Sequence, residues 1–312
     1  MSVMKALITG VNGFVGPYLV KHLVSNGFEV FGIDRSGKKK VDGCVVDSCD
    51  VTDYAAVFAV VNLVKPDLIF HLAGQSSVER SWKEPELTRK VHVLGTRNLL
   101  EAVVAGNLKP KVLIVSSAEV YGVPKRLPIT EDHPLQPVTP YGESRVEQEK
   151  LALEYFRSKG VKLVISRSFN QTGPGQPPAF VCSDFAKQVV AVERGEKGAV
   201  VVGNLDVKRD FTDVRDAVVA YLLALQKGKP GEVYNICSGN NYSIRSVLDT
   251  LISFSAKSKS ARIVSDVSKA RRNDIPELVG DNTKFQQATG WKPEVSLDQT
   301  LSDLLNYWRT MQ

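Results

Sequence analysis

The sequence predicts an α/β protein built on a doubly wound parallel sheet, with a smaller and mostly helical second lobe. Short apolar runs alternate with helical patterns through the first half of the chain, and a glycine-rich turn follows the first of these runs. Strands that alternate with helices form parallel sheets covered on both faces. A length of 312 residues, of which 43% are hydrophobic and 24% charged, suits a globular protein of roughly two lobes.

The predicted elements follow in order along the chain. Residues 5–9 form the first strand, and residues 15–26 carry apolar side chains at helical spacing. Further strands are expected at 29–33, 67–71, 111–115 and 161–166, and helices at 54–64, 86–105 and 140–159. Gly and Pro interrupt the pattern at 173–178, which indicates a change of lobe. A helix at 214–226 precedes a strand at 232–236 that suits the parallel sheet, and residues 243–309 are mostly helical with a short strand at 261–264.

The turn between the first strand and the first helix predicts a dinucleotide site. Gly10 permits the tight turn, Gly13 lets a pyrophosphate approach the backbone, and Gly16 allows close packing of helix and strand. The same turn contributes Asn12, Phe14 and Val15. Asp34 ends the second strand, where an acid binds the ribose hydroxyls of NAD, whereas Arg35 suits the 2′-phosphate of NADP. Both cofactors therefore stay open.

Other cofactor contacts are expected where later strands end. The carboxyl ends of parallel strands meet at one edge of the sheet, and ligands of this fold collect there. The residues concerned are Asp50, Val51, Leu72, Ala73 and Gly74. We therefore predict a dinucleotide-binding Rossmann-type domain over residues 1–169, to which residues 206–238 return. Residues 170–205 and 239–312 would form the substrate-binding domain.

Composition argues against several classes of protein. Lys and Arg number 40 against 34 for Asp and Glu, and this mild charge of +6 is spread along the chain, so no nucleic-acid partner is expected. No apolar run reaches the ~18 residues of a membrane span, so a cytoplasmic protein without a membrane partner is expected. The four cysteines are scattered, which predicts buried thiols and no metal site.

Five motifs resemble a known family. They are the turn at 9–16, the sequence His-Leu-Ala-Gly at 71–74, Ser-Ser-Ala-Glu-Val-Tyr-Gly at 116–122, Tyr141 with a cation four residues on, and Arg-Asp-Phe-Thr-Asp-Val at 209–214. Together they resemble the extended short-chain dehydrogenase/reductases that modify nucleotide sugars, over essentially the whole chain. The resemblance implies NAD or NADP as cofactor. It also implies a homodimer formed by the helices at 86–105 and 140–159.

The expected chemistry lies at the start of the helix at 140–159. Thr139 suits the N-cap and Pro140 the first helical position, so Tyr141 and Arg145 lie one turn apart on one helix face. A tyrosine ordinarily holds its proton to about pH 10, and a fixed cation close to the ring favours the phenolate. Tyr141 would exchange a proton with a sugar oxygen that Ser117 also hydrogen-bonds.

Two positions depart from the family. Its usual cation is Lys, and this chain has Arg145; its usual helix residue before Val93 is Asn, and this chain has His92. Arg145 keeps the charge but takes no part in releasing a proton. His92 is expected to be a structural or relay residue rather than a metal ligand. These departures leave a non-catalytic nucleotide-sugar binder as an alternative to an enzyme.

Within the family, residues 169–176 and 180–187 resemble GDP-4-keto-6-deoxy-D-mannose reductases, which make GDP-D-rhamnose. The resemblance implies a GDP-linked sugar bound by Ser76, Ser117, Asn170, Val181, Ser183, Lys187, Arg209 and Arg271. The alternatives are a 4-epimerase and a GDP-mannose 4,6-dehydratase. In the sugar dehydratases an acid and a base directly follow the Ser/Thr; here Glu119 supplies the base and Ala118 leaves the acid position empty.

Overall fold

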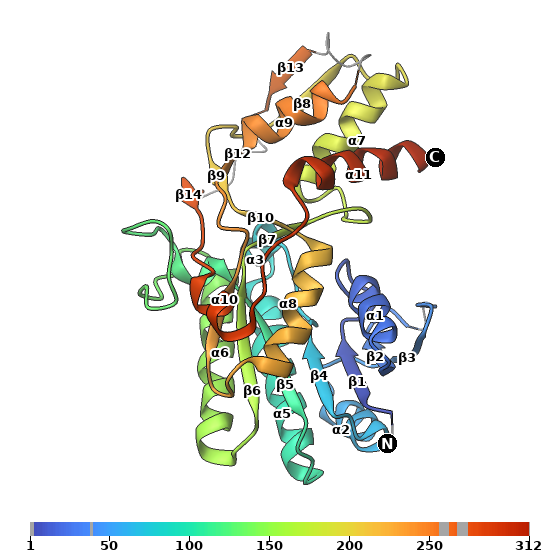
Figure 1. Cartoon of the computed structure of the whole chain (residues 1–312), viewed down its shortest axis with the longest axis vertical. Coiled ribbons are helices and arrows are strands. Elements are labelled where there is room, and N and C mark those ends of the chain that lie inside the picture. The colour runs from blue at the N-terminus through green and yellow to red at the C-terminus, as the bar shows by residue number, and fades with distance from the viewer. Residues whose placement is uncertain (1–2, 38–39, 256–261, 267–273, 312) are drawn as a thin grey trace.

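The computed structural model describes residues 3–37, 40–255, 262–266 and 274–311. Its centre is a seven-stranded parallel sheet in the order β11-β6-β5-β4-β1-β2-β3 (Figure 1). The strands are β1 Lys5–Thr9, β2 Glu29–Asp34, β3 Cys44–Ser48, β4 Leu68–His71, β5 Lys111–Ser117, β6 Leu163–Ser168 and β11 Val233–Ile236. The chain reverses its direction of travel across the sheet between β1 and β4, so ligand-binding loops are expected at that edge. This confirms the predicted doubly wound sheet.

Helices cover both faces of this sheet. One face packs against α1 Gly16–Ser25, α8 Val214–Lys227 and α10 Thr283–Thr289. The other packs against α2 Tyr54–Val64, α5 Gly95–Ala105 and α6 Pro140–Lys159. Side chains of β1 alternate between the two cores: Ala6 and Ile8 enter the first, and Leu7 enters the second. Burial on both faces explains why the strand reads as one continuous apolar run.

Most predicted elements lie within two residues of their expected bounds, and α2 and α6 match theirs. The predicted helix at 86–105 is three segments, α4 Pro85–Arg89, the π-helix η1 Lys90–Leu94, and α5. A π-helical turn carries no periodicity signal that a sequence would reveal. Strand β3, the short helix α3 Val78–Lys83 and the 3₁₀ turn η2 Ala118–Tyr121 were not predicted from the sequence.

The strand β11 lies beside β6 in parallel, as the sequence predicted, although a long excursion of the chain separates the two strands. That excursion begins the upper lobe of Figure 1. Its elements are β7 Asn170–Thr172, α7 Val181–Glu193, β8 Ala199–Val202, β9 Lys208–Arg209 and β10 Phe211–Asp213. After β11 the lobe continues with β12 Tyr242–Ser243, α9 Ile244–Ser253, β13 Arg262–Ser265, β14 Glu277–Leu278 and α11 Leu297–Thr310.

The upper lobe has a core of its own, in which α7, α9 and α11 bury their apolar faces against one another. Strand β13 pairs with β8 one residue beyond its predicted start, and α7 and β8 were not predicted. No helix in the described part of the chain is both long and apolar enough to cross a membrane.

The four cysteines are free thiols, and they differ in burial. Cys49, Cys182 and Cys237 are buried, as the sequence predicted. Cys44 is only half-buried, so the prediction is wrong for that residue. Its strand β3 lies at the edge of the sheet, where one side has no neighbouring strand to cover it.

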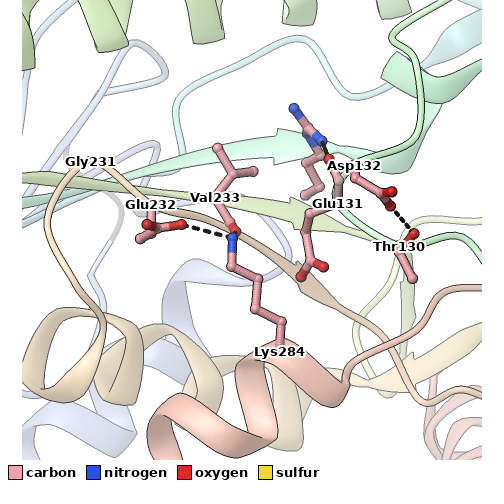
Figure 2. A pocket seen from close by; sticks show the side chains of 8 residues that line it. Thr130, Glu131, Asp132, Gly231, Glu232, Val233 and Lys284 are labelled. Carbon is pink, nitrogen blue, oxygen red and sulfur yellow. Dashed lines mark hydrogen bonds and ion pairs between the residues drawn. The ribbon is translucent and has the colours of Figure 1, made fainter.

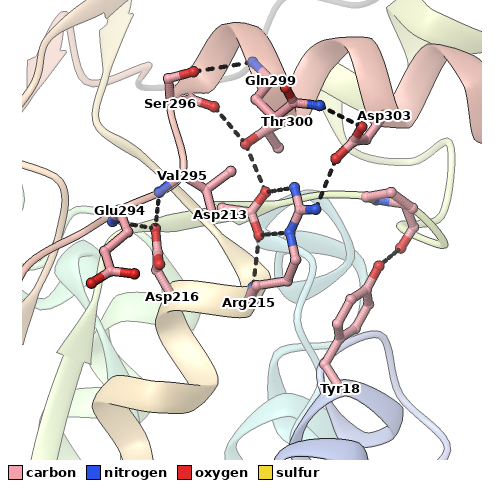
Figure 3. A network of polar contacts seen from close by, with 11 residues as sticks. Tyr18, Asp213, Arg215, Asp216, Glu294, Val295, Ser296, Gln299, Thr300 and Asp303 are labelled. Atoms are coloured by element: carbon pink, nitrogen blue, oxygen red, sulfur yellow. Dashed lines mark hydrogen bonds and ion pairs between the residues drawn. The ribbon is translucent and has the colours of Figure 1, made fainter.

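Buried carboxylates join the two lobes (Figure 3). Asp213, at the N-terminus of α8, accepts hydrogen bonds from the Arg215 guanidinium at 2.8 Å and from the Thr300 hydroxyl of α11 at 2.7 Å. Arg215 also pairs with Asp303 of α11 at 2.8 Å. Asp216 accepts the backbone N–H groups of residues 294 and 295. These bonds fix α11 against the sheet domain and so set the position of the upper lobe above the strand ends.

Candidate active site

The glycine turn between β1 and α1 lies against the segment that follows β4. Gly10 has φ +73°, and a Cβ there would stand 2.8 Å from the Ala73 Cα. A Cβ on Gly16 would stand 2.0 Å from the Val11 carbonyl oxygen. The predicted reason for Gly16, close packing of helix on strand, therefore needs correction: its missing side chain makes room for the backbone of its own turn.

The N-terminus of α1 is suited to an anion. Its first turn carries no acidic residue and no side chain caps its N–H groups. Asn12 binds the Ser36 hydroxyl and the Gly37 carbonyl through Nδ2, while its buried Oδ1 has no partner among the described residues. Unpaired N–H groups at a helix N-terminus bind phosphate. A dinucleotide pyrophosphate fits this turn, with Phe14 and Val15 beside it in sequence.

The side chains of Asp34 and Arg35 differ in how many hydrogen bonds they make within the protein. The Asp34 carboxylate accepts the Ser36 N–H at 2.8 Å, the Ser36 hydroxyl at 2.6 Å and the Asn12 N–H at 3.3 Å. Arg35 directly follows β2 and is exposed. Asp34 therefore orders the loop, and Arg35 presents a positive charge near the position expected for an adenosine ribose.

The other predicted cofactor residues line the same sheet edge. Asp50 accepts the N–H and hydroxyl of Thr52, which makes a tight turn after β3. Val51 is buried against Gly95, whose Cβ would stand 2.8 Å from the Val51 side chain. Leu72 and Ala73 follow β4, with the Ala73 N–H donating to the Thr9 hydroxyl at 3.1 Å.

Tyr141 and Arg145 form one buried unit at the start of α6. The Thr139 side chain accepts the Gly142 N–H and Pro140 occupies the first helical turn, as predicted. The Arg145 guanidinium lies 5.2 Å from the centre of the Tyr141 ring, and its Nε and Nη2 both donate to the phenol oxygen at 3.3 Å. Tyr141 is 7% exposed and Arg145 6%. A positive charge this close, in a site with little water, interacts strongly with any negative charge that develops on the phenol oxygen.

Ser117 and Glu119 lie beside this unit, where β5 meets η2. Ser117 ends β5, is half-buried, and accepts the Glu119 N–H at 3.2 Å. The N-terminus of α6 packs against η2: a Cβ on Gly142 would stand 2.6 Å from the Glu119 carbonyl oxygen. Arg145 Nη1 donates to the Val115 carbonyl oxygen at 3.0 Å. The structure thus brings the end of β5 and the Tyr141–Arg145 unit together.

His92 packs against the ring of Tyr141. The two rings meet edge to face with centroids 5.4 Å apart, and His92 is fully buried. Its Nε2 lies 2.9 Å from the Gln75 carbonyl, which only accepts, so Nε2 carries the proton. Its Nδ1 lies 2.8 Å from the Ser144 hydroxyl. Burial and the positive charge of Arg145 lower the pKa of His92 well below its ordinary value, so the ring is neutral.

A second buried histidine lies beneath the site. His71, at the end of β4, contacts the Thr9 hydroxyl at 2.7 Å through Nδ1 and the Thr96 hydroxyl at 3.0 Å through Nε2. Burial first, and the charge of Arg145 second, lower the pKa of His71 to about 3. This neutral ring connects the glycine turn to α5.

The residues that hold Arg145 were not predicted from the sequence. Gln148 is fully buried; its Oε1 accepts from Arg145 Nη1 at 2.8 Å and its Nε2 donates to the Thr96 hydroxyl at 2.7 Å. Ser81 of α3 accepts the Tyr141 N–H at 3.2 Å. The position of Gln148 three residues after Arg145, on the same helix face, was the one available signal.

The predicted substrate residues are dispersed between the two lobes. Asn170 in β7 donates to the Asp210 carbonyl oxygen. Arg209 is buried and pairs with Asp274 at 2.7 Å. Ser76 is exposed after β4, and Arg271 lies outside the described residues.

The α7 residues differ in accessibility. Val181 is half-buried at the first position of α7. Ser183 is fully buried, donates to the Gln176 carbonyl at 2.5 Å and accepts the Trp308 indole N–H at 3.0 Å, so its hydroxyl is already engaged within the protein. Lys187 is exposed, with its ammonium 5.2 Å from the centre of the Trp308 ring.

A separate pocket lies where the chain enters β11, between that strand, α10 and the loop at 130–132 (Figure 2). Lys284 of α10 reaches across it and donates to the Glu232 carboxylate and to the Val233 carbonyl oxygen, both at 2.8 Å. None of the predicted cofactor, catalytic or substrate residues lines this pocket. Its polar groups hold α10 against the sheet, so we do not assign the reaction to it.

Known proteins match this chain over most of its length. The family model described as GDP-mannose 4,6 dehydratase matches residues 7–304. A GDP-6-deoxy-D-mannose reductase of Pseudomonas aeruginosa is 36% identical over 78% of this chain and 81% of that protein. A UDP-glucose 4-epimerase of Lactobacillus helveticus is 31% identical over 93% and 92%. The solved structure of RMD from Pseudomonas aeruginosa complexed with NADPH superimposes with a TM-score of 0.86, at 31% identity and 99% coverage of both chains.

Proposed function

Because the chain belongs to the GDP-mannose 4,6 dehydratase family, we propose that it is an NAD(P)-dependent nucleotide-sugar oxidoreductase that reduces the 4-keto group of GDP-4-keto-6-deoxy-D-mannose to give GDP-D-rhamnose. The observation that carries the proposal is the buried Tyr141–Arg145 unit at the end of β5, together with the 36% identity to a GDP-6-deoxy-D-mannose reductase. The family and these relatives give no support to the non-catalytic alternative that Arg145 and His92 left open.

The expected cofactor site is the edge of the sheet from the glycine turn to β4. Gly13, where an added Cβ would meet only the Gly10 carbonyl oxygen at 3.2 Å, leaves the backbone open to a pyrophosphate, and the N-terminus of α1 faces it. When bound there, NADH or NADPH supplies a hydride to the sugar C4. The Arg35 side chain is suited to a 2′-phosphate, and the relative solved with NADPH is consistent with that choice.

Three side chains of this chain complete the reduction. Tyr141 would donate its phenolic proton to the sugar O4, and this proton together with a hydride from the bound cofactor to C4 would turn the carbonyl into a hydroxyl. Arg145 stabilises the phenolate that remains, through two hydrogen bonds that shorten as the oxygen gains charge. The Ser117 hydroxyl donates to the same O4 and orients the carbonyl.

The upper lobe is the proposed sugar-nucleotide site. We assign residues 1–169 and 206–238 to cofactor binding, and residues 170–205 and 239–312 to the substrate. Asn170 and the start of α7 would hold the nucleotide, and Arg209 the diphosphate, with Asp274 keeping its guanidinium in place. Ser183 serves this site indirectly, by fixing α7 against Trp308.

A 4-epimerase is the second candidate, favoured by the 31% identity to a UDP-glucose 4-epimerase over 93% of the chain. A dehydratase is disfavoured because Ala118 offers no acid beside Ser117. To separate the candidates, purified protein is incubated with 4-keto-6-deoxy sugars linked to GDP, UDP and dTDP and with either reduced cofactor. The reductase oxidises one cofactor for each GDP-sugar; an epimerase interconverts 4-hydroxy sugars with no net change in nicotinamide absorbance.

We also propose a homodimer through α5 and α6. Half-buried apolar side chains of these helices, Val104, Leu153 and Phe156, pack on the core and keep part of their surface accessible. Sedimentation that shows a monomer at micromolar concentration would refute this pairing. A cytoplasmic location stays a prediction.

A further inference from the structure

We propose that Gly74 and Gln148 are positioning residues that make the site beside Tyr141 specific for arginine. This inference rests on the proposed function, because it concerns the cation of that reaction. The backbone of Gly74 lies outside the left-handed region, so its conformation does not require glycine.

Gly74 leaves space for the guanidinium of Arg145. A Cβ at this position would stand 2.8 Å from Arg145 Nη2 and 3.1 Å from His92 Nε2. Contacts this short are repulsive, so an added methyl group displaces the guanidinium from the phenol oxygen or breaks the bond from His92 to the Gln75 carbonyl. Gly74 thus leaves room for the Nη2 group, one of the two that donate to Tyr141.

Gln148 orients the guanidinium of Arg145. The Thr96 hydroxyl donates to the His92 carbonyl at 2.6 Å, so toward Gln148 it only accepts. The Gln148 amide must therefore point its Nε2 at Thr96 and its Oε1 at Arg145. Arg145 Nη1 is held by that Oε1 and by the Val115 carbonyl, which aims Nε and Nη2 at Tyr141.

A lysine cannot make this set of bonds. Its ammonium is one nitrogen on a flexible stem, whereas the planar guanidinium reaches Val115, Gln148 and Tyr141 at once. With lysine at position 145, at least one buried acceptor loses its partner. Gly74 and Gln148 therefore serve arginine in particular, and the effects of changing them must depend on which cation is present.

The test compares Gly74→Ala and Gln148→Met in the natural protein and in the Arg145→Lys variant. In the natural protein we expect each to lower kcat about tenfold or more, to change KM less than threefold, and to shift the pH profile of kcat. In the Arg145→Lys background each should change kcat less than about threefold. Gly198→Ala is the matched control, because a Cβ there meets nothing within 4 Å. Equal losses in both backgrounds would overturn the inference.

A second readout does not depend on turnover. Gly74→Ala should lower the thermal unfolding midpoint by roughly 3 °C or more in the natural protein and by less than half as much in the Arg145→Lys variant. An equal shift in both backgrounds overturns the inference even if no sugar is turned over. Absence of wild-type turnover with a background-dependent shift would instead contradict the proposed function alone.

Discussion

The guanidinium of Arg145 donates two hydrogen bonds to the phenol oxygen of Tyr141, one from Nε and one from Nη2, each 3.3 Å long. The bonds are long for charged donors and a neutral acceptor, and both partners are buried. Hydrogen bonds from a charged donor strengthen as negative charge develops on the acceptor oxygen. The proposed reduction depends on that contact between Arg145 and Tyr141.

Removing the positive charge of Arg145 tests its role beside Tyr141. Arg145→Met leaves Tyr141 without its charged partner and should lower kcat about 100-fold or more. Arg145→Lys keeps the charge but loses the bonds to Val115 and Gln148, so a loss of about tenfold is expected. Steady-state kinetics at saturating cofactor measure both. Equal activity in Arg145→Met and the natural protein would contradict the role of the charge.

The preference for NADPH over NADH tests whether Arg35 binds the 2′-phosphate of the cofactor. Its guanidinium is exposed near the expected ribose, so Arg35→Ala should raise KM for NADPH roughly tenfold and leave KM for NADH nearly unchanged. Lys21→Ala, on the exposed face of α1, is the control for a general change of charge. If both cofactors weaken equally, Arg35 does not read the 2′-phosphate.

The free energy of unfolding at acid pH tests the lowered pKa of the buried His71. Its pKa is about 3 in the folded protein against about 6.5 when unfolded, so the unfolded chain binds the additional proton between these values. The stability that neutral His71 contributes is complete above pH 6.5 and is lost as the pH falls. Each unit below about pH 6 should cost up to about 1.4 kcal/mol.

Urea unfolding at pH 7 and pH 5 measures this slope. His71→Asn should be less stable at pH 7, because it loses a ring bonded to Thr9 and Thr96, and should lose less stability on going to pH 5. A variant with the same slope as the natural protein would show that His71 does not titrate as described.

A substitution at Glu119 distinguishes a reductase from a dehydratase. A dehydratase needs a base to take the C5 proton, whereas the reduction uses only Ser117, Tyr141 and Arg145. Glu119→Gln should therefore change kcat for the 4-keto sugar less than about threefold. The natural protein should also release no water from GDP-mannose, which mass spectrometry of the nucleotide sugar would detect. A loss of about 100-fold in Glu119→Gln would assign this carboxylate to the chemistry.

Much of the fold and of the candidate active site could be predicted from the sequence because the signals are local. The glycine turn, the Thr139 cap and the one-turn spacing of Tyr141 and Arg145 each depend on residues close in sequence, and the structure confirms that geometry. The apolar runs of the buried strands likewise indicated the order of strands and helices.

The rest depends on contacts between distant segments. Gln148 reaches Thr96 across 52 residues of sequence, and the engagement of Ser183 by Trp308 spans 125. The π-helical turn that carries His92 has no periodic signature. None of these can be derived from spacing alone, because each needs the packing of α6 on α5 or of α11 on α7.

The most direct test of the account follows nicotinamide absorbance while the purified protein acts on GDP-4-keto-6-deoxy-D-mannose with NADPH or NADH. We expect one cofactor oxidised for each GDP-D-rhamnose formed, and a rate in Tyr141→Phe that is lower by about 10²–10⁴-fold with substrate binding retained. No oxidation by the natural protein, or an equal rate in Tyr141→Phe, would contradict it.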